Sequence, residues 1–352
     1  MSTVFRLRRP PDPATLGALW QAVAARYEAS FFQDWAWTGA LFAERFPDPW
    51  LLSAERNGET LGLALFNRTR RLGRSRLWLG ESGAPEWDRL FIEYNGWLGD
   101  PALAAAAWRA ARRAGAEEDG RGSPFGRELI LSGIDTAGCA AARAAGRLHV
   151  RQSRVAPAID LDVLCADGRD YLALLSANTR QQLRRSDARH AAAGALRIDA
   201  ATTQAEAEDF LDRLIVLHQA SWQRRGQPGA FADPRIPRFH RALIAEALPR
   251  GNVELLRIAA GETPVGYLYN FRSRRRVLSY QSGFAYAPAD PHRKPGLTCH
   301  HQAIRRALEN DDGVYDFLAG AERYKQSLVP QSADASTTLY WAELGTLRGL
   351  IA

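Results

Sequence analysis

The sequence predicts two similar α/β units in tandem, each a mixed sheet with flanking helices. Three observations predict this fold class: the length of the chain, a repeated glycine pattern, and a repeated order of helices and strands. The 352 residues suit two domains of roughly 150 residues each. Hydrophobic residues make up 46% of the chain, which is enough for each domain to bury a core.

A short pattern occurs once in each half of the chain. Two adjacent leucines are followed by Gly-Glu-Thr and then by a second glycine, which lies 11 residues after the first leucine in both copies. An arginine pair follows each copy. Glycine beside polar residues suits a tight turn, so each copy predicts a β-hairpin. The residues are Leu51-Leu52, Gly58-Glu59-Thr60, Gly62 and Arg70-Arg71 in the first half, and Leu255-Leu256, Gly261-Glu262-Thr263, Gly266 and Arg274-Arg275 in the second.

The predicted elements follow one order in both halves, namely strand, helix, helix, hairpin, strand, helix and strand. In the first half these are residues 4–8, a helix from 12, 34–46, the hairpin, 89–94, 101–114 and 128–134. In the second half they are 196–200, a helix from 203, 237–248, the hairpin, 277–284, 295–310 and 314–319. Pro101 and Pro295 each open a helix, where a missing N–H is not needed. The last three elements form a β-α-β crossover, which makes its two strands parallel neighbours.

Between the two copies, residues 148–162 read as strand and residues 170–193 as one helix. That helix carries Arg180, Arg184, Arg185 and Arg189, and it is interpreted either as a bridge between the units or as an ordinary solvated connector. We therefore expect a first domain at 1–160, a basic bridging helix within 161–194, and a second domain at 195–352.

The composition indicates a basic protein of a reducing compartment. The formal net charge is +7, which attracts anions or simply reflects a solvated basic surface. Three scattered cysteines, without a CxxC pair, predict neither a disulfide framework nor a zinc site. The sequence shows no signal-peptide h-region and no run of 18 apolar residues, so we expect a cytoplasmic protein without a membrane span.

Several common enzyme classes lack their motifs in this sequence. No G-x-S-x-G, H-E-x-x-H or Walker pattern occurs. Cys299-His300-His301 resembles a metal cluster, but consecutive helical residues point about 100° apart and do not converge on one ion. We therefore expect no metal and no DNA partner.

The doubled unit resembles the GNAT acetyltransferase fold in tandem, as in the Fem-like peptidyltransferases. From about residue 155 to 330 the sequence is similar to the CelD-type (BcsL) acetyltransferases of cellulose and exopolysaccharide operons. In the first half the similarity rests on element order and on Phe32-Gln33 with Trp35. The motifs are Leu217-His218, Ser221-Trp222, Arg225-Gly226, Gly229-Ala230-Phe231, Tyr280-Gln281-Ser282-Gly283-Phe284, Lys294-Pro295-Gly296-Leu297, Tyr315-Asp316-Phe317-Leu318 and Tyr324-Lys325.

This resemblance implies an acyl-coenzyme A donor, acetyl-CoA or another acyl-CoA, bound by the second half. The segment before the helix at 295 places cations and a glycine where helix N–H groups favour a pyrophosphate. Its counterpart in the first half, residues 95–100, has no cation and ends in Asp100. We therefore interpret the first half as a degenerate copy on the acceptor side. The predicted donor-binding residues are Gln281, Ser282, Gly283, Arg293, Lys294, Pro295, Gly296 and Leu297, with a β-bulge at Ser282-Gly283.

The family also implies roles in acyl transfer. Tyr324 corresponds to a tyrosine that protonates the departing sulfur, and Lys325 to a lysine near the reacting carbonyl. His218 and Asp316 are the leading candidates for the general base, with Glu322 behind them. The predicted acceptor-binding residues are Trp222, Arg225, Arg180 and Arg184.

The sequence leaves three functions open. The first is N- or O-acyl transfer to a small molecule or glycan, for which the family suggests an exopolysaccharide or cell-envelope precursor and polysaccharide-synthesis machinery as partner. The second is a Fem-like transferase that uses aminoacyl-tRNA. The third is a non-catalytic module of the same doubled fold.

Overall fold

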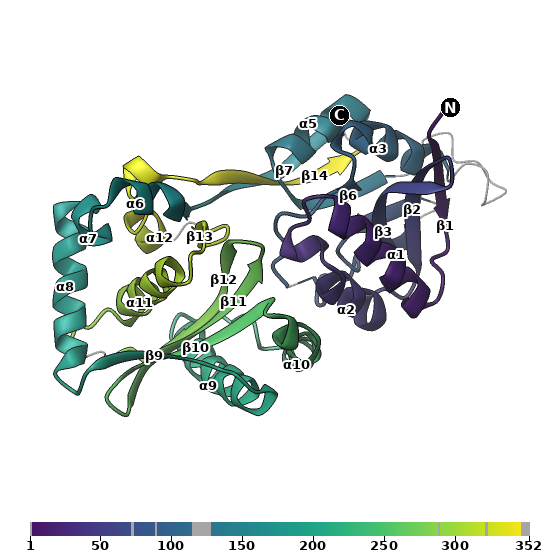
Figure 1. Ribbon diagram of the computed structural model, residues 1–352. Helices are drawn as coiled ribbons and strands as arrows, with labels where there is room; N and C mark the ends of the chain where they lie inside the picture. Colours follow the sequence, from purple (N-terminus) through teal and green to yellow (C-terminus); the bar gives the residue numbers. More distant parts are fainter. Residues whose placement is uncertain are drawn as a thin grey trace, which may run out of the picture. The chain divides into compact units, whose positions relative to one another are not determined.

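The computed structural model describes residues 2–71, 74–88, 90–114, 128–287, 289–320 and 323–345. It contains two compact units, the first made of Met1–Arg154 with Thr338–Ala352 and the second of Val155–Thr337. Each unit is a mixed sheet flanked by helices (Figure 1), so the predicted fold class is confirmed. The division differs from the predicted segments, because residues 161–194 lie inside the second unit and the last strand lies in the first.

The first unit has the strand order β1-β2-β3-β4-β6-β14-β7, with β5 paired to β3. Its core packs Trp108 of α3 against Phe66 and the strands beneath. The strands are β1 (Val4–Arg8), β2 (Pro49–Arg56), β3 (Glu59–Arg71), β4 (Arg74–Leu79), β5 (Leu98–Gly99), β6 (Glu128–Ile134), β7 (Leu148–Ala156) and β14 (Thr337–Leu344). The helices are α1 (Pro13–Arg26), α2 (Trp35–Arg45), α3 (Ala104–Arg113) and α5 (Thr136–Ala145), with the 3-10 turns η1 (Phe31–Gln33) and η2 (Pro101–Leu103).

The second unit has the strand order β8-β13-β12-β11-β10-β9. Its strands are β8 (Ala158–Asp160), β9 (Leu196–Ala200), β10 (Val253–Ala260), β11 (Thr263–Ser273), β12 (Arg276–Phe284) and β13 (Val314–Asp316). Its helices are α6 (Leu161–Asp167), α7 (Tyr171–Leu174), α8 (Ala177–Ala191), α9 (Gln204–Gln223), α10 (Arg235–Ala247), α11 (Pro295–Glu309) and α12 (Arg323–Ser327), with the 3-10 turns η3 (Leu248–Arg250) and η4 (Gln331–Ala333).

Two glycines let helices approach the second sheet closely from opposite faces. A Cβ at Gly283 would lie 2.3 Å from the Leu214 carbonyl oxygen of α9, and one at Gly266 would lie 2.9 Å from the Cys299 sulfur of α11. Gly266 pairs with Phe284, the neighbour of Gly283, so the two glycines face opposite sides because successive residues of a strand alternate. Helices α9 and α11 therefore cover different faces of the sheet.

Most predicted elements are confirmed, including both first strands, both hairpins and the parallel pairing of β12 with β13. One strand prediction is wrong. The parallel neighbour of β6 is β4, whereas residues 90–94 form no strand, and Arg89 lies outside the described residues. Strand β4 begins within a run of arginines, where an apolar pattern is absent.

Three further elements differ from the sequence prediction. The helix predicted at 170–193 is two helices, because Ser176 caps a new one through the Thr179 amide. Strand β13 ends at Asp316 rather than at 319, because the Asp316 carboxylate accepts the Leu318 amide (2.7 Å) in a turn where Leu318 has φ +58°. Strand β14 was not predicted.

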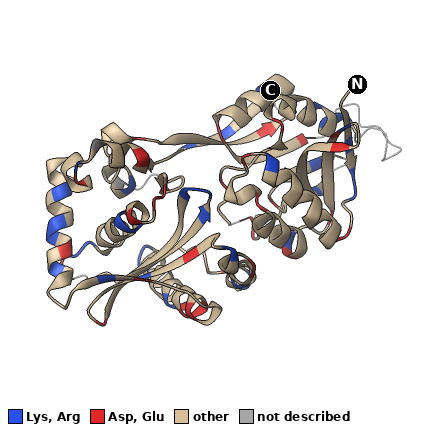
Figure 2. Ribbon diagram, in the orientation of Figure 1, with Lys and Arg blue, Asp and Glu red and all other residues tan. Residues whose placement is uncertain are grey.

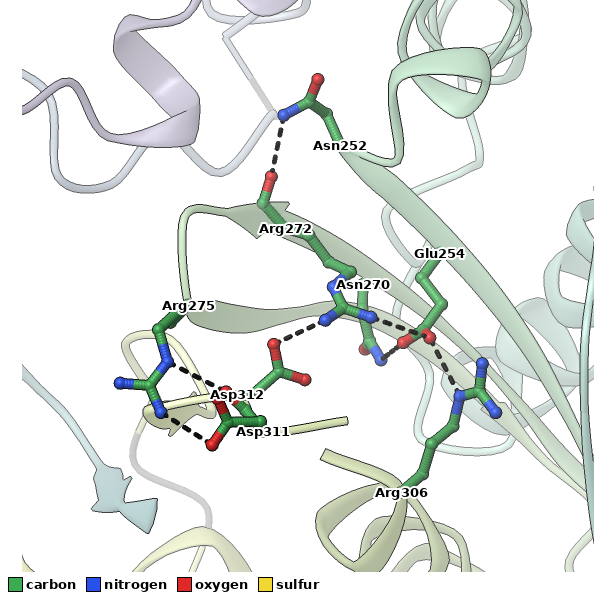
Figure 3. A network of polar contacts seen from close by, with 8 residues as sticks. All are labelled: Asn252, Glu254, Asn270, Arg272, Arg275, Arg306, Asp311 and Asp312. Atoms are coloured by element: carbon green, nitrogen blue, oxygen red, sulfur yellow. Dashed lines mark hydrogen bonds and ion pairs between the residues drawn. The ribbon is translucent and has the colours of Figure 1, made fainter. Parts of the chain in front are cut away.

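A buried ion network fixes the C-terminal end of α11 to the sheet (Figure 3). Glu254 of β10 accepts hydrogen bonds from Arg306 of α11 (3.0 Å) and Arg272 of β11 (3.4 Å), and Arg272 also pairs with Asp312. Burial raises the pKa of Asp312 even though Arg272 lowers it. A buried carboxylate requires such partners, so this network sets where α11 ends relative to β10 and β11.

The described residues contain no helix that is both long and apolar enough to cross a bilayer.

Candidate functional site

The second sheet opens between its two parallel strands. Pairing of β12 with β13 covers only Arg276–Leu278 against Val314–Asp316, whereas β12 continues to Phe284. After β13 the Phe317 amide donates to the Pro157 carbonyl (2.9 Å), so the chain stays on the β8 side. The two parallel strands therefore part after the Leu278–Asp316 pair.

A bulge in β12 lies just beyond this point. The pairing with β11 passes from Asn270↔Ser279 to Tyr269↔Gln281, which leaves Tyr280 as the extra residue. The predicted bulge at Ser282-Gly283 is therefore wrong by two residues. Gly283 serves instead the close approach of α9, and Gln281 and Ser282 lie on the stretch of β12 beyond the bulge.

Asp316, one predicted base, lies at the divergence of the strands and is fully buried. One carboxylate oxygen accepts from Arg276 (2.6 Å), and the other accepts the Leu318 amide. Both oxygens are engaged within the protein, so the geometry favours a structural role at the end of β13.

His218, the other predicted base, ties α9 to β12. Its Nδ1 donates to the Ser282 carbonyl (3.0 Å), and its Nε2 accepts the Ala230 amide (3.2 Å). Burial lowers the pKa of His218, which keeps the ring neutral as this bonding requires. A base would need the Nε2 lone pair that Ala230 occupies. The third candidate, Glu322, lies outside the described residues.

The predicted donor loop is braced by α8. The Lys294 amide donates to Ser186 Oγ (2.9 Å), and this hydroxyl also contacts the Lys294 carbonyl and Thr298 Oγ1. Lys294 Nζ donates to Gln182 Oε1 (2.6 Å). The loop residue that precedes α11 is thus held through its amide, carbonyl and side chain.

The first turn of α11 combines packing with positive charge. Pro295 and Leu297 are buried, whereas a Cβ at Gly296 would contact the Phe284 ring at 3.2 Å. Arg293 pairs with Asp290, and Arg185 of α8 contacts His292 Nδ1 (3.4 Å). Basic residues lie along α8 and at the loop before α11 (Figure 2). This arrangement favours an anion at the N-terminus of α11.

Tyr324 and Lys325 lie on α12, which follows the opening. The Tyr324 ring stacks on His300 of α11 with centroids 5.5 Å apart and planes at 28°. Lys325 Nζ contacts the Leu318 carbonyl at 3.5 Å. The predicted proton donor and lysine are therefore together beside the end of β13.

The four predicted acceptor residues do not form one group. Arg225 lies over the Trp222 ring (5.5 Å) at the end of α9, and α9 packs on one face of the sheet. Arg180 and Arg184 are on α8, which is bonded to α11 on the other face. Arg180 donates to the Ala173 carbonyl (3.1 Å). The spacing of residues in the sequence does not show that the sheet separates the end of α9 from α8.

Two residues to which the sequence analysis gave no role in the reaction, His300 and Tyr315, lie near Tyr324. His300 is 2% exposed, and its Nδ1 lies 3.0 Å from the Tyr315 hydroxyl. Burial, with Lys325 nearby, lowers the pKa of His300 to about 3. Leu297, His300 and Ile304 share one helical face, and this spacing could have marked His300 as buried. Among the described residues no cluster of His, Cys, Asp and Glu is suited to a metal.

The corresponding place in the first unit is filled by its own backbone. The Asn95 amide donates to the Gly133 carbonyl (3.0 Å), and Asn95 Nδ2 donates to the Leu79 carbonyl at the end of β4 (3.1 Å). Gly133 has φ +69°, and a Cβ there would lie 2.1 Å from the Ile92 oxygen. Asn95 therefore bridges β4 and β6 where β12 and β13 part in the second unit.

Glu81 follows β4 beside this bridge. Burial and the nearby Asp88 raise the pKa of Glu81 to about 7. Asp88 itself accepts the Ser82 and Gly83 amides, so two carboxyl groups share a partly buried region of the first unit.

Sequence comparison finds one family model that matches within the second unit. Residues 177–326 match the model of the acetyltransferase (GNAT) domain. No curated protein matches the chain in sequence.

Solved structures match the whole chain. FemX has a TM-score of 0.59 at 10% identity, with 95% of this chain and 96% of that chain covered. L-PGS from Bacillus licheniformis has a TM-score of 0.57 at 11% identity, with 97% of this chain and 94% of that chain covered. A tandem GNAT protein from the clavulanic acid biosynthesis pathway has a TM-score of 0.50 at 13% identity, with 98% of this chain and 99% of that chain covered. At these identities the likeness concerns the fold. The chain therefore has the tandem GNAT fold, and residues 177–326 match the acetyltransferase (GNAT) domain family.

Proposed function

We propose that the protein transfers an acyl group from an acyl-coenzyme A to a small-molecule or glycan acceptor, with the donor in the second unit. The observation that carries this proposal is the parting of β12 and β13, with the basic start of α11 on one side and Tyr324 and Lys325 on the other. The closed counterpart at Asn95 supports a single donor site per chain. The resemblance to CelD-type enzymes suggests an exopolysaccharide or cell-envelope precursor as acceptor.

In this proposal each residue has one role in the displacement of coenzyme A by the acceptor. The acceptor attacks the thioester carbonyl, the carbon–sulfur bond breaks, and the thiolate takes the proton of the Tyr324 hydroxyl. The proton that the acceptor loses passes through solvent to the Tyr324 oxygen and restores its hydroxyl. Lys325 offsets the negative charge that develops on the carbonyl oxygen. The start of α11, with Arg293 and Lys294, binds the donor phosphates.

Calorimetric titration with acetyl-CoA tests the proposal directly. We expect one binding site per chain and a thermal stabilisation that grows with ligand concentration. Two sites per chain would contradict the assignment of the first unit as a closed copy, and absence of binding would contradict the donor itself.

A second candidate is transfer from aminoacyl-tRNA, as the Fem-like resemblance implies. The observation that favours it is the exposed basic side of α8, with Arg184, Arg185 and Arg189. Binding of a phosphodiester backbone falls steeply with salt. Salt-sensitive binding of aminoacyl-tRNA, without binding of acetyl-CoA, would favour this function. A protein that binds glycan without releasing thiol would instead be a non-catalytic module.

A further inference from the structure

A short chain of buried polar groups runs behind Tyr324. The Tyr315 hydroxyl bonds to the Ser279 side chain and to His300 Nδ1. Ser279 directly precedes the bulge of β12, whereas His300 lies on α11. The imidazole is thus connected through Tyr315 to the strand that borders the opening.

The imidazole is not explained by packing alone. His300 Nε2 is buried and has no hydrogen-bond partner among the described residues. A buried polar atom without a partner costs about 1–3 kcal/mol. A phenylalanine would fill this space without that cost, so the polar ring must serve another purpose.

The ring is held in one orientation by its neighbours. Phe284, Tyr315 and Phe317 meet it edge-on, at interplanar angles of 70°, 83° and 63°. Tyr324 stacks on its face. The bond to Tyr315 prevents rotation of the imidazole, which an apolar ring in the same slot would not resist.

We propose that His300, locked by Tyr315, is a positioning residue that fixes the ring of Tyr324 for proton transfer to the leaving sulfur. This inference rests on the proposed function, because it takes Tyr324 as the proton donor. His300 acts as a neutral ring, since its pKa is far below physiological pH, so the Tyr324 proton is placed without being withdrawn by a positive charge.

The test uses Tyr315→Phe and His300→Phe in the full chain. Tyr315→Phe keeps the ring but removes the hydroxyl that locks His300, whereas His300→Phe keeps a ring beneath Tyr324 without the lock. We expect kcat to fall about 10-fold or more in both, with KM and Kd for acetyl-CoA unchanged. Thiol release is measured with hydroxylamine as the nucleophile. In a Tyr324→Phe background neither change should reduce kcat further.

A control and a spectroscopic measurement separate positioning from general damage. Cys299→Ala removes a buried side chain of the same helix that faces Gly266 of β11, and it should leave kcat unchanged. Nitrogen NMR of histidine-labelled protein should show His300 in one neutral tautomer in wild type and a change of that signal in Tyr315→Phe.

Failure of the positioning role and failure of the proposed function give different results. If Tyr315→Phe and His300→Phe release thiol as fast as wild type while Tyr324→Phe does not, the positioning role is wrong and the proposed function stands. If their losses add to that of Tyr324→Phe, His300 does not act through Tyr324. If wild type neither binds acetyl-CoA nor releases thiol, the proposed function itself fails.

Discussion

In the proposed function, Lys294 serves donor binding and Tyr324 serves the chemistry, so substitutions at the two residues should have different effects. Lys294→Glu places a negative charge beside the expected phosphates and removes the bond to Gln182, so acetyl-CoA affinity should fall about 10-fold or more. Tyr324→Phe keeps the ring but lacks the proton, so turnover should fall about 100-fold with little change in affinity.

Titration calorimetry and thiol release measure the two effects. Arg305→Glu, a charge reversal at an exposed position of the same helix, is the control and should bind the donor normally. Unchanged affinity in Lys294→Glu would move the phosphate site elsewhere, and normal turnover in Tyr324→Phe would require another acid.

Glu81 of the first unit gives a pH-dependent stability. Its pKa is about 7 in the folded protein against 4.5 for the ordinary side chain, so the folded state binds more protons between these values. Its contribution to stability is therefore present below pH 4.5 and lost as the pH rises through 7. Glu81→Gln should stabilise the protein at pH 8 by about 1–3 kcal/mol and have little effect at pH 4.5.

Urea unfolding at both pH values tests this difference. The exposed Glu86 provides the control, since Glu86→Gln should change the two midpoints alike. Equal stabilisation by Glu81→Gln at both pH values would show that Glu81 ionises normally.

The sequence predicts candidate site residues that motifs mark, such as Lys294 and Tyr324, because the order of elements places them after a strand or at the start of a helix. It does not show that His218 is bonded at both nitrogens or that Tyr315 holds His300. Those contacts join residues far apart in the sequence, and their geometry depends on the packed fold.

At the scale of elements, α8 supports the loop before α11, which we propose binds the donor. Ser186→Ala removes a hydroxyl bonded to the Lys294 amide and to Thr298, so we expect a loss of about 1–2 kcal/mol and weaker acetyl-CoA binding. Ser176→Ala removes the cap of the same helix for about 1 kcal/mol but does not touch the loop. Comparison of unfolding and titration should show similar destabilisation, with reduced affinity only in Ser186→Ala.

The elements that were predicted correctly have a local signal. Asp12, Thr203 and the Gly-Glu-Thr turns fix helix starts and hairpins through their own side chains and backbone. The errors concern long-range pairing. Residues 90–94 look like a strand because Leu90 and Ile92 are buried, yet β4 is the partner of β6, and nothing near Thr337–Leu344 indicates that it enters the first sheet.

At the scale of the whole molecule, stability of the first unit depends on the end of the chain. Leu344 of β14 is fully buried in the first core, and Leu328 is equally buried in the second. Each Leu→Ala change should cost about 2–5 kcal/mol. Hydrogen exchange should quicken in β6 for Leu344→Ala and in β13 for Leu328→Ala. Faster exchange in β13 for Leu344→Ala and in β6 for Leu328→Ala would contradict the pairing of β14 with β6.

The place of β14 between β6 and β7 also has a consequence during synthesis. About 180 residues separate β7 from β14, so a ribosome at 5–20 residues per second needs roughly 10 to 40 seconds to make them. Throughout that interval the nascent first half has an unfilled gap in its sheet, with exposed strand edges that invite association. A chaperone that shields such edges should therefore raise the yield of soluble protein, and slower translation should lower it.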